Sequence, residues 1–129
     1  MRTAVTVAQM LVRVCGVVQI VLGILFWTGS APGLVPVHIL IGIVLVLSLW
    51  ALVALGTRAG LHAGQVTVAV LWGVVVVVFG LTQDSILQSG PHWVIRILHL
   101  LVGLAAIGMA EGLGARIKRS PAAAGPAVS

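Results

Sequence analysis

The sequence predicts an all-α integral membrane protein, a bundle of four transmembrane helices. Of its 129 residues, 60% are hydrophobic and only 7% are charged, and the mean hydropathy is +1.25. Ordinary soluble domains do not have this composition. Four long apolar runs make up most of the chain, and each is close to the ~20 residues that a helix needs to cross a hydrocarbon core. Short connectors between the runs make neighbouring helices antiparallel.

The apolar runs give the expected helices. Backbone groups in lipid must satisfy their own hydrogen bonds, so we expect helices even where valines cluster, as at 74–78. The first run has a cleaved signal peptide as its alternative, but Arg13 interrupts it and favours a retained helix. One domain then covers residues 1–114, and small residues and prolines predict a disordered cytoplasmic tail over 115–129. The helices are expected at about 5–27, 34–55, 63–81 and 93–110.

Turn residues separate these runs. The stretches TGSAPG at 28–33 and GTRAG at 56–60 are rich in glycine, which is typical of turns and helix ends. The longest connector, TQDSILQSGP, covers residues 82–91. Connectors of this length join helices that lie side by side, which predicts a compact bundle.

Positive charge predicts the orientation of the bundle. The side opposite to the termini carries Asp84, with Arg96 just inside the membrane. The positive-inside rule therefore puts both termini in the cytoplasm, and we expect a multi-pass protein of a bacterial plasma membrane. The net charge of +5 needs no nucleic-acid partner, and Arg13 is expected to pair with Glu111. The basic residues on the side of the termini are Arg2, Arg13, Arg58, Arg116, Lys118 and Arg119.

The chain also contains a weak internal repeat. GVVQIVLG at 16–23 shares five of eight residues with GVVVVVFG at 73–80, and VHILIG at 37–42 shares three of six with LHLLVG at 98–103. Valine-rich segments also match by chance, but the repeated glycines and histidines favour a duplicated helical hairpin. A repeat of this kind has its axis along the membrane normal, so the second and fourth helices run in the same direction.

Each of these two helices carries one histidine near its start. His38 and His99 lie roughly 6 and 9 Å into their helices at 1.5 Å per residue, so the two imidazoles are expected to face each other. An ionisable side chain within the membrane indicates a functional site. Zinc needs three or four ligands, and no cysteine or carboxylate lies at this depth. Haem iron needs only two axial ligands, so we expect His38 and His99 to ligate haem b.

Small residues near the histidines would make room for the haem. Gly42 and Gly103 lie one turn beyond His38 and His99 on the same helix faces. Arg96, one turn outward from His99, is expected to pair with a haem propionate. The same glycines also suit ordinary helix packing, which needs no cofactor. The glycines expected to line the pocket are Gly16, Gly23, Gly42, Gly73, Gly80 and Gly103.

Residues 17–50, VVQIVLGILFWTGSAPGLVPVHILIGIVLVLSLW, resemble one four-helix half of the haem A synthase family. That family has a Gln-Ile-x-Leu-Gly-Ile pattern, then a loop with proline and a haem-ligating histidine, which His38 matches. The resemblance implies haem between His38 and His99, and membrane cytochromes b are similar more loosely. No carboxylate precedes His38, so the resemblance is to the cofactor-carrying half. The pattern is matched by Gln19, Ile20, Leu22, Gly23 and Ile24.

These features together predict a membrane b-type haem protein that acts in electron transfer or haem handling. Two axial histidines leave no open site on iron, so we expect no stand-alone enzyme. The expected partners are haem and membrane lipid, and a homodimer or a redox complex is compatible. Two alternatives stay open, a haem-free scaffold or accessory subunit and a small transporter whose polar path is His38, His99 and Arg96. His62 and His92, at loop edges, are not expected to be ligands.

Overall fold

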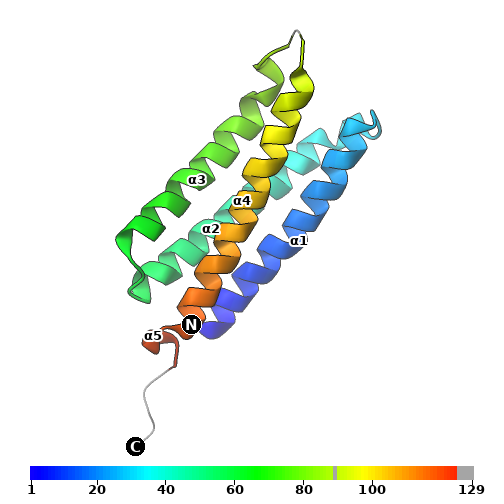
Figure 1. Ribbon diagram of the computed structural model, residues 1–129. Coiled ribbons are helices and arrows are strands. Elements are labelled where there is room, and N and C mark those ends of the chain that lie inside the picture. The colour runs from blue at the N-terminus through cyan, green and yellow to red at the C-terminus, as the bar shows by residue number, and fades with distance from the viewer. Residues whose placement is uncertain (89, 125–129) are drawn as a thin grey trace, which may run out of the picture.

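The computed structural model describes residues 1–88 and 90–124, and this part of the chain is helical without any β-strand. Short helices flank the long ones, namely η1 (Pro32–Leu34), η2 (Gln83–Ser85) and α5 (Pro121–Ala124). The four long helices are each long and apolar enough to span a membrane, so the predicted all-α bundle is confirmed. They are α1 (Arg2–Trp27), α2 (Val35–Arg58), α3 (Ala63–Thr82) and α4 (His92–Arg119) (Figure 1).

Three helix boundaries lie three or more residues from the predicted ones, and one of them is the end of α2, at Arg58 instead of near residue 55. Helix α1 begins at Arg2, three residues before the apolar run, and α4 continues to Arg119 instead of ending near residue 110. The last turn of α4 is rich in basic side chains, and cations there are favourable because the helix dipole is negative at its C-terminus. Residues 115–119, which were expected in the disordered tail, are therefore helical. The end of that tail, 125–129, lies outside the described residues.

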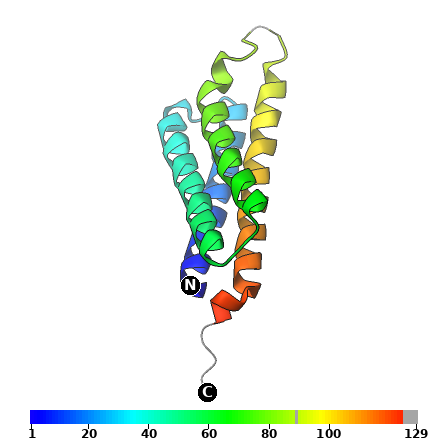
Figure 2. The same cartoon turned by 90° about the vertical axis from the view of Figure 1, so that its left-hand side faces the viewer.

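The helices are antiparallel to their chain neighbours, and α2 and α4 also touch across the diagonal (Figures 1 and 2). Both termini and the α2–α3 turn lie at one end, which we call the terminal end. The other two connectors lie at the opposite end, the histidine end. Gly29 and Gly60, in the two short turns, both have φ of +75°, a left-handed conformation that glycine adopts without steric cost.

The packed core lies in the terminal half of the bundle. Cys15, Leu45, Val46 and Ala106 lie near the middle of their helices. Beyond the middle, toward the histidine end, the described residues contribute Leu22 and Ile95 as buried apolar side chains. The bundle is thus tightly packed at one end and loosely packed at the other. The connected core consists of Val5, Ala8, Val12, Cys15, Leu45, Leu49, Leu52, Val53, Ala69, Ala106, Ala110, Leu113 and Ile117.

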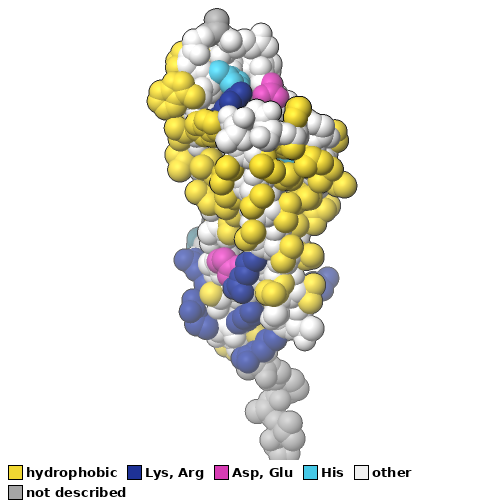
Figure 3. All heavy atoms as spheres, turned by 90° about the vertical axis from the view of Figure 1, so that its right-hand side faces the viewer, with side chains coloured by type: hydrophobic (Ala, Val, Ile, Leu, Met, Phe, Trp, Pro, Cys, Tyr) yellow, Lys and Arg dark blue, Asp and Glu magenta, His cyan; other side chains and the backbone are white. Residues whose placement is uncertain are grey.

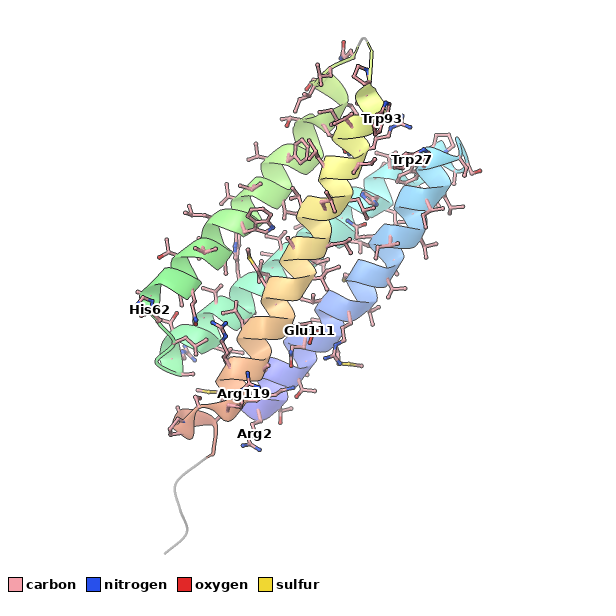
Figure 4. The ribbon with its side chains drawn as sticks, viewed as in Figure 1. Arg2, Trp27, His62, Trp93, Glu111 and Arg119 are labelled. Atoms are coloured by element: carbon pink, nitrogen blue, oxygen red, sulfur yellow. The ribbon has the colours of Figure 1, made fainter. Side chains whose placement is uncertain are left out.

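Polar contacts tie the helices together in the terminal half. Arg13 donates from Nε to Oε1 of Glu111 at 2.7 Å and from Nη2 to Oε2 at 2.8 Å, so the predicted pair is confirmed. Gln9 donates to the same carboxylate at 3.0 Å. Glu111 therefore links α4 to two positions on α1 (Figure 4). Near the middle of the bundle, Trp72 joins α3 to α4 by donating to the carbonyl of Val102 at 3.0 Å.

The surface has the zones of a membrane protein. Large apolar side chains are exposed on all four helices, for example Val17, Leu40, Leu71 and Leu101, and patches of this extent mark contact with lipid or protein. One face shows an apolar band across the middle of the bundle (Figure 3). Lysine and arginine side chains gather at the terminal end of this face. Length, composition and surface together indicate an integral membrane protein.

We expect Gly73→Ala to destabilise the bundle by about 1–3 kcal/mol, because the added methyl group overpacks a buried contact. Gly73 is buried, and a Cβ there would collide with the indole of Trp50, whose Nε1 donates to the carbonyl of Val70 at 3.4 Å. The measurement is the midpoint of chemical unfolding in detergent. Gly108→Ala is the matched control, because a Cβ there meets no atom within 4 Å. Equal midpoints for the two variants would contradict this packing.

Candidate functional site

The structure brings His38 and His99 together. Their ring centroids lie 6.1 Å apart, with the ring planes inclined by 47°. His38 lies in the first turn of α2 and His99 in the second turn of α4, and these two helices are in diagonal contact. The prediction that the two imidazoles face each other at similar depth is confirmed.

Each imidazole also packs against a phenylalanine of its own hairpin. The ring centroid of Phe26, on α1, lies 5.4 Å from that of His38 in an edge-on arrangement. The ring centroid of Phe79, on α3, lies 6.0 Å from that of His99. Aromatic pairs at these distances are attractive, so the two phenylalanines restrict how the imidazoles can turn.

A small cavity of about 60 Å³ lies beside the two histidines and is lined by all four helices. Helix α1 contributes Gln19, a site residue that sequence reasoning matched to a family pattern but did not assign to the pocket. One feature of the sequence could have placed Gln19 at the site. It is a single amide in an apolar run, and it lies about as far from the histidine end of its helix as His99 does. The lining consists of Gln19, His38, Ile39, Gly42, Ile43, Val76, Val77, Gly80, Leu81 and His99.

Three polar atoms of the residues around this cavity have no hydrogen-bond partner within the described chain. They are Nδ1 of His38, Nδ1 of His99 and Oε1 of Gln19, and all three are buried. A buried polar atom without a partner costs about 1–3 kcal/mol, and folded proteins satisfy nearly all such groups. Water or another group in the cavity would supply the missing partners.

Two of the predicted pocket glycines line the cavity. A Cβ at Gly42 would come within 2.7 Å of Nε2 of Gln19, and a Cβ at Gly80 would come within 3.3 Å of Cε1 of His99. Glycine at these two positions therefore lets the amide and the imidazole lie close to the neighbouring backbone. Their role in the structure is to admit polar side chains into the bundle.

The other four predicted pocket glycines do not line this cavity. Gly16 is covered by Ile107 of α4, and Gly73 is covered by the indole described above. Positions 23 and 103 adjoin open space, because a Cβ at either would meet no atom within 4 Å. The structure thus separates glycines that pack helices together from glycines beside the histidines.

His62 and His92 lie away from the cavity, at the loop edges where they were predicted. The side chain of His62 caps α3 by accepting the N–H of Gly64 at 3.1 Å, at the terminal end (Figure 4). Nδ1 of His92 lies 3.2 Å from the carbonyl oxygen of Ile86, and Nε2 lies 3.9 Å from Asp84. Both imidazoles therefore have local partners, unlike Nδ1 of the two that face each other.

The donor atoms of the site suit one metal centre held from two sides. Two imidazoles that coordinate the same metal through nitrogen place their ring centres ~6 Å apart, given metal–nitrogen bonds of ~2 Å. The separation of His38 and His99 is 6.1 Å. Within residues 1–88 and 90–124, no group of three or more His, Cys, Asp or Glu side chains is placed to hold a bare ion. A metal held by this pair would have to bring its own further ligands, as haem iron does.

The space beside the histidines is much smaller than a porphyrin. A cavity of about 60 Å³ has room for about two water molecules at ~30 Å³ each. A macrocycle therefore enters only if the helices move apart in the histidine half. That half holds little packed core, so the movement would break few contacts. Arg96, exposed on α4 one turn outward from His99, does not line the cavity.

Comparison of the chain with protein-family models, with curated proteins and with solved structures finds no match. The resemblance to haem A synthases and to membrane cytochromes b therefore stays a prediction from the residues that carry it. What the site does must follow from its geometry.

Replacing both His38 and His99 by leucine is expected to raise the midpoint of chemical unfolding of the cofactor-free protein. The substitution removes two buried, unpartnered nitrogens, each worth about 1–3 kcal/mol of lost solvation. His62→Leu is the control, because it removes the cap of α3 and is expected to lower the midpoint. A less stable double variant would mean that the imidazoles hold the helices together, as in the haem-free scaffold.

Proposed function

We propose that this chain is a membrane-embedded b-type haem protein in which His38 and His99 ligate the iron from its two faces. The observation that carries the proposal is the pair of imidazoles whose centroids lie 6.1 Å apart, each with a buried Nδ1 that lacks a partner. Ionisable groups are expensive inside a membrane and are kept there for function. Haem is the cofactor that two opposed imidazoles are sufficient to hold.

The residues around the site have distinct parts in this proposal. When bound, the haem would supply one-electron iron chemistry. His38 and His99 would hold it, while Phe26 and Phe79 keep the imidazoles oriented. Gln19 presents a free carbonyl oxygen, to which a ring N–H can donate, and such a bond raises the basicity of a metal-ligating histidine. Because both axial positions are filled, electron transfer or haem handling fits better than oxygen chemistry.

In this proposal the helix segments beside the two imidazoles move to make room for the macrocycle, while the imidazoles keep the separation that suits axial ligation. The core and the Glu111 contacts lie in the terminal half and hold the hairpins together during that movement. The open space at Gly23 and Gly103 adds room for the ring edges. Arg96 is exposed and one turn outward from His99, within the reach of a propionate, to which a charge-assisted hydrogen bond is favourable.

Duplication and orientation are further parts of the proposal. Gly16 packs against α4, and Gly73 packs against α2. A two-fold axis between the hairpins would relate these two contacts, as the proposed repeat requires. The basic side chains at the terminal end (Figure 3) support termini in the cytoplasm. The haem would then lie in the outer half of a bacterial plasma membrane, and a redox partner would carry electrons across the other half.

One observation favours a second candidate, a haem-free bundle that serves as a scaffold or accessory subunit. The cavity of about 60 Å³ accepts water but no macrocycle without movement of the helices. In that case the imidazoles and Gln19 would enclose ordered water, which satisfies buried polar groups in many proteins. The two candidates differ in whether the protein takes up haem.

Protein purified from a haem-sufficient host is expected to be red, with a Soret band that shifts on reduction. Changing either His38 or His99 to alanine removes one axial ligand and is expected to weaken haem binding at least about tenfold, a loss that even second-shell partners of a metal can cause. The measurement is a haemin titration followed by absorbance. His62→Ala is the control and is expected to leave the spectrum unchanged. A colourless, folded protein that takes up no haemin would contradict the haem proposal and favour the haem-free bundle.

Labelling of introduced cysteines with a membrane-impermeant maleimide tests the orientation. In a Cys15→Ser background, Ser30→Cys at the histidine end is expected to react in intact cells, because the positive-inside rule puts that end outside. Ala63→Cys, at the terminal end, is expected to react only after permeabilisation. Both positions are exposed, so burial does not explain a difference. The reverse pattern would place the histidines in the inner leaflet.

A further inference from the structure

A groove of about 670 Å³ runs along the outside of the bundle between α1 and α2. It lies in the terminal half, far from the histidine cavity. Four alanines line it together with five larger valines and leucines, and the alanines are Ala4, Ala8, Ala51 and Ala54. Ser48 also lines it, but its hydroxyl donates to the carbonyl of Val44 at 2.8 Å. The wall of the groove is therefore apolar over most of its length.

On its α2 side the groove is as long as one leaflet of a bilayer, and on its α1 side the lining covers the shorter stretch from Ala4 to Leu11. On α2 its lining extends from Val44 to Arg58, 14 positions apart, which is ~21 Å along a helix. Half of a bilayer with its headgroups measures ~20–22 Å. Val44 lies near the middle of its helix, and Arg58 is the last residue of that helix. The groove thus runs from the mid-plane of the membrane to the level of the headgroups.

The charge at the end of the groove decides between its possible occupants. Among the described residues that line the groove, Arg58 alone is charged, and its side chain is exposed. A second copy of this chain, inserted in the same direction, would bring its own basic terminal end to the same level (Figure 3). Like charges would then meet. An anionic lipid headgroup complements Arg58 instead, and basic residues near the membrane surface attract such lipids.

We propose that this groove is a binding site for one anionic phospholipid. An acyl chain lies against the alanines between α1 and α2, and the phosphate contacts the guanidinium of Arg58. The chain fills a hollow that would otherwise lose dispersion contacts, and the headgroup pairs with the cation. The site rests on the terminal half alone, so it stands or falls separately from the proposed haem.

Native mass spectrometry of the protein released from nanodiscs tests the site. The nanodiscs contain equal amounts of phosphatidylglycerol and phosphatidylcholine with identical acyl chains. The wild-type protein is expected to retain one phosphatidylglycerol in preference to phosphatidylcholine. Arg58→Gln is expected to reduce that retention about fivefold, the effect of one basic residue near a membrane surface, and Ala54→Leu, which fills the groove, is expected to reduce retention of both lipids.

Arg119→Gln is the matched control, because Arg119 belongs to the same basic end but does not line the groove. It is expected to retain lipid like the wild type, and helicity by circular dichroism shows that each variant is folded. Equal retention of the two lipids by the wild type would overturn the proposal, and so would equal losses in Arg58→Gln and Arg119→Gln. The proposal would also be overturned if the wild-type protein were released as a dimer and Ala54→Leu were released as a monomer. In that case a second copy of the chain would occupy the groove.

Discussion

The approach of His38 and His99 across the diagonal of an apolar bundle is the contact on which the histidine half depends. Their centroids lie 6.1 Å apart, and the surroundings supply no partner within the described chain for either Nδ1. Lipid offers no water to replace such a partner. The sequence nevertheless makes room for polar groups here, since Gly42 admits the amide of Gln19 and Gly80 admits the ring of His99. A bundle that needed only stability would place leucines at these positions.

In the proposed function, the two halves of the bundle divide stability from binding. The terminal half contains the connected core and the carboxylate of Glu111, which accepts hydrogen bonds from Arg13 and Gln9. In the histidine half, the imidazoles of His38 and His99 are half-buried, and a cavity lies beside them. Binding sites commonly give up local stability, and the polar groups around this cavity follow that pattern. The well-packed half can anchor all four helices while the other half adapts to a ligand.

The sequence predicted what depends on spacing along one helix. The apolar runs predicted four helices, and helix positions 38 and 99 predicted equal depth. Charge predicted the contact of Arg13 with Glu111. Features that depend on how helices rotate and how closely they approach were beyond such reasoning. Gly16 and Gly73 share a repeat with the cavity glycines, yet they pack against other side chains, because two helices face each other along one line only. The size of the cavity also depends on how the helices rotate and approach, so spacing along one helix could not predict it.

Pulsed electron paramagnetic resonance of the haemin-loaded, ¹⁵N-histidine-labelled protein tests most directly whether the two imidazoles share one iron. Among the histidines, only axial ligands place a nitrogen next to the unpaired electron, and the ¹⁵N label distinguishes these nitrogens from the ¹⁴N of the porphyrin. The predicted result for the wild-type protein is low-spin iron with two strongly coupled axial imidazole nitrogens. In His99→Ala, one such nitrogen is expected. A high-spin spectrum with a single coupled imidazole in the wild-type protein, or no iron signal beyond free haemin, would contradict it.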